Sequence, residues 1–139
     1  MTTSLDELIA AHWDALVDDI AKDAICQIPS YHQAPIRVTM ERVGRWLQTC
    51  ADSIRENDPH LLERYLTGVG EERKEQGYAI HELHAIVSIT EQHLRDLIDR
   101  SYADPVERSA QKSLLDAVLA GARMVLSITF ILGIADKRS

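Results

Sequence analysis

The sequence is poor in cysteine, with only Cys26 and Cys50 among its 139 residues. So few cysteines exclude a disulfide framework, and a chain of this length buries a hydrophobic core without one. Both cysteines stand in segments with the apolar spacing of helices, where cysteine usually packs as a small hydrophobic side chain. We therefore predict that they contribute to packing and not to redox chemistry.

Positive charge is also scarce, because 15 Lys and Arg stand against 22 Asp and Glu, which gives a net charge of −7. The basic residues are scattered among acids, so no continuous positive surface is expected for phosphate backbones or anionic lipids. We predict neither nucleic acid nor a membrane as a partner. The N-terminus carries an acidic helix start, Ser4 to Glu7, in place of a basic region followed by an apolar stretch, which favours a cytoplasmic protein.

Common catalytic motifs are missing too, including the Gly-x-Ser-x-Gly elbow, the Gly-x-x-x-x-Gly-Lys phosphate loop and Cys-x-x-Cys. His81 and His84 form a close pair, but their spacing is one residue short of the His-Glu-x-x-His pattern of zinc proteases. At about 100° per residue, His93 points about 180° away from His84, so the three imidazoles do not converge. The sequence therefore predicts a non-catalytic protein without a metal or a cofactor.

Proline and glycine are few, and they mark the ends of long segments with helical apolar spacing. No stretch alternates with period two for long enough to suggest a sheet. Residues 1–139 are therefore predicted to form a single all-α domain of about five helices. The expected helices run from Ser4 to Ile28, from Ile36 to Ile54, from Pro59 to Gln76, from Ile80 to Leu97, and from Pro105 to Ala135.

The last of these helices is apolar enough over residues 114–136 to suggest a membrane span. Asp116 and Arg123 interrupt it, and its longest uncharged run, Met124 to Ala135, has 12 residues against the roughly 20 that a span needs. One face of this helix is assigned to the domain's own core. Its members are Leu114, Ala117, Gly121, Met124, Ile128 and Ile131.

A second stripe on the same helix is predicted to form a homodimer interface. A helix over residues 105–135 is about 46 Å long, whereas a compact domain of this size has a diameter of about 37 Å. Its C-terminal turns should therefore project beyond the domain, where apolar side chains mark an interface. The predicted interface residues are Ala120, Arg123, Ser127, Phe130 and Ile134.

The stretch GVGEERKEQGYAIHELHA carries a Gly-x-x-Arg-x-x-Gln-Gly pattern, formed by Gly70, Arg73, Gln76 and Gly77. Together with the preceding IPSY segment and the helix after it, this pattern resembles the N-terminal sensor domain of the RsbR-type proteins of bacterial stressosomes, the RsbT co-antagonist family. The resemblance covers roughly residues 8–100. It implies a globin-like helical fold without haem, a dimer, and usually a downstream STAS domain that builds the complex and receives phosphoryl groups from a partner kinase.

The same motif has a structural interpretation. Gly77 is expected to end its helix in the left-handed conformation, and Gly68 and Gly70 are expected to let another helix approach closely. Arg73 would complement the helix dipole and pair with a carboxylate, namely Glu71, Glu72 or Glu82. In the alternative functional interpretation, Arg73 anchors a ligand or holds a switch.

Two functions are compatible with these sequence features. The leading one is a signal-input and dimerisation module of a bacterial stress-response regulator, which responds to an unknown small ligand and passes the signal through its last helix to a STAS-domain protein. The alternative is a globin-like sensor that binds haem or another cofactor. Haem-binding relatives resemble this segment with a histidine at the position of Arg73, and arginine is a poor iron ligand. His81, His84 or His93 would have to replace it.

Overall fold

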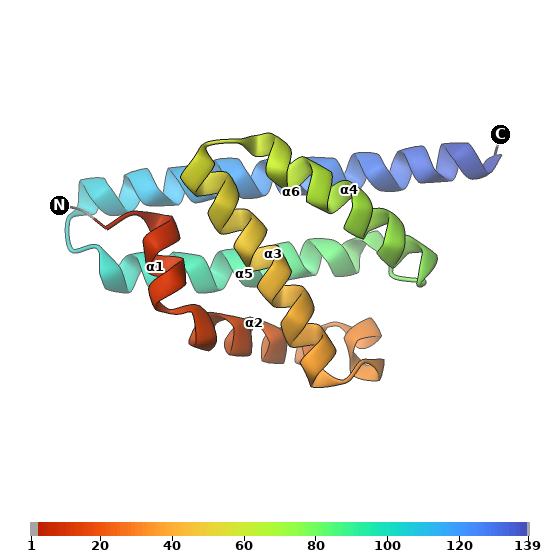
Figure 1. Cartoon of the computed structure of the whole chain (residues 1–139), viewed down its shortest axis with the longest axis horizontal. Coiled ribbons are helices and arrows are strands. Elements are labelled where there is room, and N and C mark those ends of the chain that lie inside the picture. The colour runs from red at the N-terminus through yellow and green to blue at the C-terminus, as the bar shows by residue number, and fades with distance from the viewer. Residues whose placement is uncertain (1–2, 139) are drawn as a thin grey trace.

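The computed structural model describes residues 3–138, although the side chains of Pro59 and of residues 132–138 lie outside the description. Within this range the chain is helical and contains no strand, so the predicted all-α class is confirmed (Figure 1). It forms six α-helices rather than five, together with one short 3₁₀ helix, η1. In chain order the elements are α1 (Leu5–Ala11), α2 (Trp13–Gln27), η1 (Pro29–Gln33), α3 (Ile36–Glu56), α4 (Pro59–Glu75), α5 (Ile80–Ser101) and α6 (Pro105–Arg138).

The extra helix arises because the first predicted helix breaks at His12, whose φ of −112° and ψ of 23° leave the helical region. No glycine or proline stands between Ser4 and Ile28, so the sequence contains no local signal for the break. Tertiary packing accounts for it: α1 lies against α3, whereas α2 turns to run against both α3 and α5 (Figure 1). The bend thus lets both segments bury their apolar faces.

Most helix ends follow the signals in the sequence. The Asp58 carboxylate accepts a hydrogen bond from the N–H of His60 at 2.9 Å, and the Asp104 carboxylate accepts one from Val106 at 3.3 Å. Both bonds satisfy N–H groups that the first turn of a helix leaves without a partner. The end of α3 was not predicted: Asn57 takes a left-handed conformation with φ 51°, which asparagine tolerates better than most residues.

The two cysteines differ in their surroundings. Cys50 is buried in α3, as predicted, and burial raises the pKa of its thiol because the charged thiolate is poorly solvated there. Cys26 is exposed, so its expected burial was wrong. Cys26 lies near the end of α2, two residues after the buried Ala24 and therefore about 200° around the helix from its inward face.

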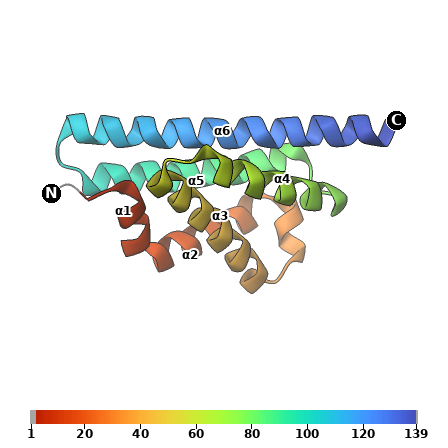
Figure 2. The ribbon, with the colours of Figure 1, turned by 45° about the horizontal axis from the view of Figure 1, so that its top comes forward.

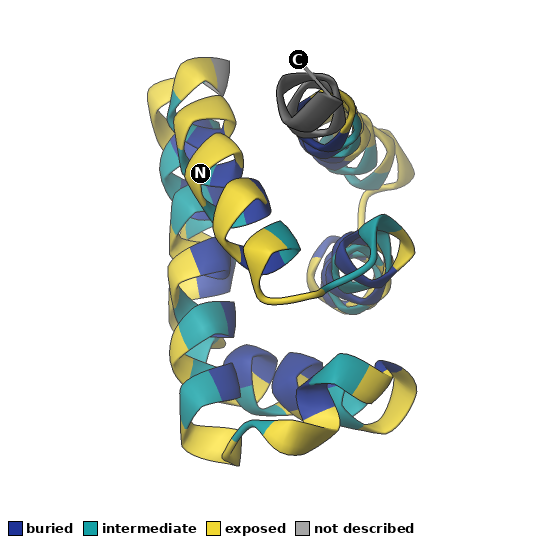
Figure 3. Ribbon diagram, turned by 90° about the vertical axis from the view of Figure 1, so that its right-hand side faces the viewer, coloured by how far each residue is buried: buried dark blue, intermediate teal, exposed yellow. Residues whose placement is uncertain are grey.

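Buried apolar side chains form one cluster that includes residues of every helix and of η1. Figure 3 shows that buried residues lie on the inward sides of the helices, with exposed residues outside. Helices α5 and α6 run antiparallel side by side, and α4 packs on α6 (Figure 1). This pairing places the end of α4, the start of α5 and the second half of α6 at one end of the molecule.

Helix α6 is much longer than its neighbour. Its 34 residues span about 51 Å, whereas the 22 residues of α5 span about 33 Å. Figure 2 shows the C-terminal turns of α6 extending beyond the other helices. The helix therefore provides both a wall of the domain and a projecting arm.

Candidate functional site

The motif that ends in Gly77 builds the C-terminus of α4. Gly77 has φ +90°, as predicted, and its N–H donates to the carbonyl of Lys74 at 3.1 Å. The N–H of Tyr78 donates to the carbonyl of Arg73 at 2.9 Å. These two bonds are the Schellman pattern, which satisfies carbonyls that would otherwise lack partners. The turn folds Tyr78 back onto the last turn of α4.

We expect Gly77→Ala to destabilise the protein by about 1 kcal/mol, because alanine pays a steric cost in the left-handed region. At this chain length that loss lowers the melting midpoint by about 3–6 °C, which circular dichroism resolves. Gly68→Ala is the matched control, since a Cβ at Gly68 meets no atom within 4 Å and its backbone is helical. Equal midpoints for Gly77→Ala and the wild type would contradict the prediction.

Gly70 permits the close approach of two helices. A Cβ placed there would lie 3.2 Å from Cγ2 of Thr129 on α6, which is tighter than ordinary van der Waals contact. The prediction of close helix approach is thus confirmed for Gly70. It was wrong for Gly68, which faces open space.

Arg73 is buried beside this turn, and its side chain is only 8% exposed. Its Nη1 donates to Oε1 of Glu72 at 2.9 Å and to Oε1 of Gln76 at 3.1 Å. Its guanidinium carbon lies 5.9 Å from the ring centroid of Tyr78, within the range of a cation–π contact. The predicted pairing with a carboxylate is therefore confirmed for Glu72.

Glu82, another predicted partner of Arg73, has a different role. Its carboxylate accepts hydrogen bonds from the N–H of Ala79 at 3.0 Å and from the N–H of Ser30 at 3.1 Å. These bonds hold the pKa of Glu82 below its usual value, because they stabilise the ionised form. Glu82 therefore caps α5 and ties η1 to it, which fixes Tyr31 beside the α4–α5 turn.

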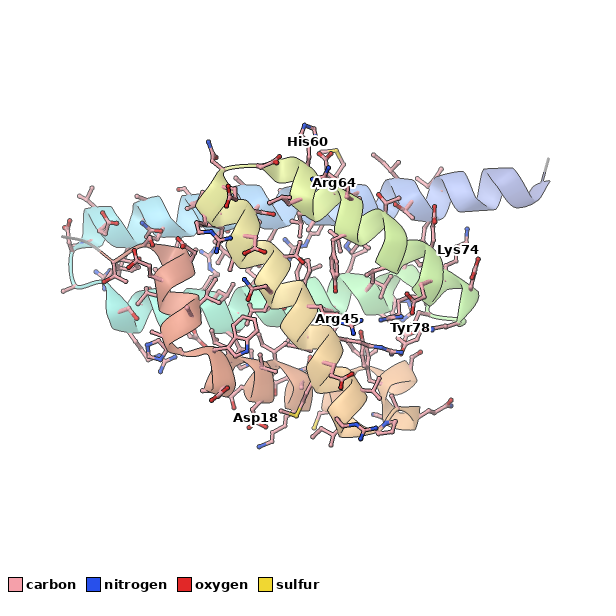
Figure 4. The ribbon with its side chains drawn as sticks, in the orientation of Figure 1. Asp18, Arg45, His60, Arg64, Lys74 and Tyr78 are labelled. Atoms are coloured by element: carbon pink, nitrogen blue, oxygen red, sulfur yellow. The ribbon has the colours of Figure 1, made fainter. Side chains whose placement is uncertain are left out.

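Arg73 also lines a cavity of about 50 Å³ that borders the core and is partly open to solvent. Arg42 of α3 reaches the same cavity, and its Nη1 donates to the hydroxyl of Tyr78 at 3.3 Å. Tyr78 is labelled at the turn after α4 in Figure 4, and its ring meets that of Tyr31 edge-on with 5.4 Å between centroids. The cavity is lined by Tyr31, Arg42, Val43, Trp46, Tyr65, Leu66, Val69, Arg73, Leu83, Ile86, Val87 and Leu126.

The sequence motif led to Arg73 but not to Arg42 of α3, Tyr31 of η1 or Tyr65, which lies two turns earlier on α4. Burial raises the pKa of Tyr31 to about 12, while nearby Arg73 and Arg42 act in the opposite direction. Burial also raises the pKa of Tyr65, again opposed chiefly by Arg73. Both hydroxyls therefore stay protonated at neutral pH and lie within electrostatic reach of a guanidinium.

The three histidines of α5 point to different surroundings. His81 is exposed, whereas Nε2 of His84 lies 3.2 Å from Oγ of Ser127 on α6. Burial, and then the nearby charge of Arg123, lower the pKa of His84. His93 contacts the carboxylate of Asp23 on α2. In the part of the chain that the structure describes, no three His, Cys, Asp or Glu side chains gather as a metal site requires.

The predicted interface stripe on α6 lies mainly against the domain itself. Phe130 is 8% exposed, and Nζ of Lys74 lies 5.8 Å from its ring centroid. Arg123 lies 3.5 Å from a carboxylate oxygen of Glu91 on α5, and Ser127 contacts His84. Ala120 is exposed, and Ile134 lies outside the described side chains.

The face of α6 that was assigned to the core is instead turned to solvent. Met124, Ile128 and Ile131 are among the exposed large apolar residues, at 62%, 47% and 65%, and Leu114 is also exposed. A Cβ at Gly121 would meet no atom within 4 Å. The buried face is formed by Leu115, Leu119, Ala122, Leu126 and Phe130. This correction has a simple cause: α6 has apolar residues on more than one face, and only the tertiary contacts decide which face is buried.

Residues Pro105–Ile131 of α6 also have the length and composition of a membrane-crossing helix. One such helix is only weak evidence for a membrane span, because core helices of other proteins share these properties. Three charged residues of this segment form ion pairs with α5. Nη1 of Arg95 lies 2.7 Å from the Asp116 carboxylate, Nζ of Lys112 lies 2.6 Å from the Asp99 carboxylate, and Arg123 pairs with Glu91.

Comparisons with known protein families, curated proteins and solved structures found no match to this chain. The resemblance to RsbR-type sensor domains therefore stays a prediction. The geometry thus offers two features for a functional proposal: the exposed apolar stripe of α6 and the cavity beside Arg73.

Proposed function

We propose that the chain is a non-catalytic signal-input and dimerisation module of a bacterial stress-response regulator. In this proposal it acts in the cytoplasm as a homodimer, and α6 passes the signal to a downstream STAS-type domain or partner. The haem-free, globin-like fold of RsbR-type sensor domains belongs to the same proposal. The observation that supports it most strongly is the exposed stripe on α6.

The exposed stripe repeats with the spacing of a coiled-coil seam. Successive members are three, four, three, four and three residues apart, which is the pattern of a and d positions in heptads. We call it the α6 seam; it consists of Leu114, Ala117, Gly121, Met124, Ile128 and Ile131. A second copy of the chain presents the same stripe, so two seams can bury each other.

The middle of the α6 seam suits close helix contact. Ala117 and Gly121 are small, and a groove of about 210 Å³ runs beside them toward Ile54 and Leu62 of α3 and α4. This groove leaves room for larger side chains of a second copy. Met124, Ile128 and Ile131 follow on the C-terminal side, where they provide the apolar area of the contact.

A parallel pairing of α6 accounts for signal output. It brings both C-termini to the same end of the dimer, at the projecting arm of Figure 2. A change in the packing of the core against α6 then alters the spacing or rotation of the two helices. A downstream domain attached there receives that change as a movement.

The alternative, a haem-binding globin, fits the observed residues less well. The cavity of about 50 Å³ is far below the roughly 300 Å³ of the smallest usual ligand pockets. Its lining includes Arg73 and Arg42 but none of His81, His84 and His93. Arginine stays protonated and is a poor iron ligand, so the donor set does not suit haem.

Cysteine cross-linking tests the parallel pairing. In a Cys26→Ser, Cys50→Ala background, Ile128→Cys is expected to form a disulfide-linked dimer on mild oxidation, because identical a positions face each other in a parallel coiled coil. Val106→Cys is the control, since Val106 is exposed on the same helix but lies outside the α6 seam. An antiparallel pair separates the two copies of residue 128. Equal cross-linking of both variants, or none of Ile128→Cys, would count against the proposal.

A further inference from the structure

The cavity beside Arg73 carries positive charge without a negative counterpart in its lining. Arg42 and Arg73 are its only ionised lining residues, and no Asp or Glu belongs to the lining. Within residues 3–138, Arg42 forms no ion pair and bonds only to the hydroxyl of Tyr78. A guanidinium stays charged at every accessible pH. The cavity therefore favours an anion.

Arg73 has donors to offer to such an anion. Both of its hydrogen bonds, to Glu72 and to Gln76, use Nη1. Its Nε and Nη2 groups lie on the other edge of the planar guanidinium, which can hold a carboxylate through two parallel hydrogen bonds. Burying a charged side chain to this degree is costly unless a partner compensates for it. Glu72 provides one such partner at Nη1, and a bound anion would add a second at the Nε and Nη2 edge.

Neutral donors stand next to the two arginines. Tyr31 and Tyr65 belong to the lining and carry protonated hydroxyls, and neither hydroxyl donates a hydrogen bond elsewhere among the described residues. The hydroxyl of Tyr78 accepts from Arg42, which leaves its own proton available. Tyr78 lies outside the lining, so the donors that face an anion in this position come from η1, α3 and α4.

The remaining wall sets the chemistry of the rest of the ligand. It is apolar and mostly aliphatic, formed by Val43, Trp46, Leu66, Val69, Leu83, Ile86, Val87 and Leu126. Aliphatic walls favour methylene groups over the further oxygens of phosphate or sulfate, which would lose their water there. A volume of about 50 Å³ limits the ligand to a few non-hydrogen atoms.

We infer that this cavity binds a short-chain monocarboxylate, with Arg42 and Arg73 holding the carboxylate and the aliphatic wall holding the chain. The further assignment of this cavity as the signal input of the module rests on the proposed function. Leu126 of α6 lines the site. Thr129, one turn further along α6, makes the close contact with Gly70. Filling the cavity therefore acts on the helix that carries the α6 seam.

Titration calorimetry with sodium butyrate, at constant ionic strength, tests the site. The wild type is expected to bind one butyrate per chain with a saturable heat, and its melting midpoint should rise with butyrate concentration. Arg42→Gln should weaken binding at least about tenfold, because it removes a charged donor to the carboxylate. Arg37→Gln is the matched control, since Arg37 is an exposed arginine of the same helix.

Arg73→Gln provides a second test of the same donor pair, and circular dichroism shows whether that variant folds. Absence of heat with butyrate, an equal response to chloride, or unchanged affinity in Arg42→Gln would overturn the inference. Light scattering in the same samples separates this outcome from failure of the proposed function. If the protein is a monomer that binds butyrate, the proposed dimer is refuted and the binding site stands. If it is a dimer that does not bind butyrate, only the binding site is refuted.

Discussion

Glutamate in place of both Met124 and Ile128 is expected to convert a homodimer into a folded monomer. In the single chain these side chains are 62% and 47% exposed, so their loss leaves the core intact. In a paired α6 seam the same substitutions bring four carboxylates into an apolar contact. Burying unpaired charges costs several kcal/mol each, which exceeds what a few apolar pairs contribute. Light scattering gives the mass, and circular dichroism reports the helices.

The matched control places two glutamates on other exposed apolar residues, Ile36→Glu with Val106→Glu. These positions are 48% and 76% exposed and lie outside the α6 seam. The control adds the same charge and should leave the dimer intact. A wild type that is monomeric at high concentration, or a Met124→Glu, Ile128→Glu variant that remains dimeric, would refute the homodimer through this face.

Features fixed by neighbouring residues could be predicted from the sequence. Gly77 ends α4 because a residue without a Cβ tolerates φ +90°, and Asp58 caps the same helix at its start. Both effects involve atoms within a turn of the residue, so a short motif is enough to indicate them. The all-α class follows in the same way, because the apolar spacing of each segment has the helical period.

Features that depend on distant contacts could not be predicted in this way. The break at His12 leaves no mark in the sequence, because α3 and α5 impose it. The two faces of α6 were exchanged for a related reason: leucine at 115 and 119 and methionine and isoleucine at 124 and 128 are all apolar. Composition alone does not tell a face that meets α4 and α5 from one that is exposed in the single chain.

The candidate site also combines a residue that a local motif indicates with residues that only the fold brings together. Arg73 stands in a local motif, so the sequence drew attention to it and left open whether its role was structural or functional. Arg42 and Tyr31 come from elements more than 30 residues earlier, and no short spacing connects them to Arg73. Only the tertiary arrangement of η1, α3 and α4 brings them to one cavity. The charge of that cavity was therefore invisible in the sequence.

Leu119→Ala is expected to destabilise the domain strongly. Leu119 is fully buried, and truncating a buried leucine costs about 2–5 kcal/mol through lost contacts and the cavity left behind. For a domain whose total stability is about 5–15 kcal/mol, this loss should lower the melting midpoint by about 10 °C or more. The measurement belongs in the Met124→Glu, Ile128→Glu background, so that dimer formation does not contribute.

Leu114→Ala in the same background is the matched control, since it is the same chemical change on the α6 seam. Leu114 is 37% exposed in the single chain, so its truncation removes less buried area and should cost under about 1 kcal/mol. The ratio of the two losses therefore measures which face of α6 belongs to the domain. A larger loss for Leu114→Ala than for Leu119→Ala would restore the original assignment and place the α6 seam inside the fold.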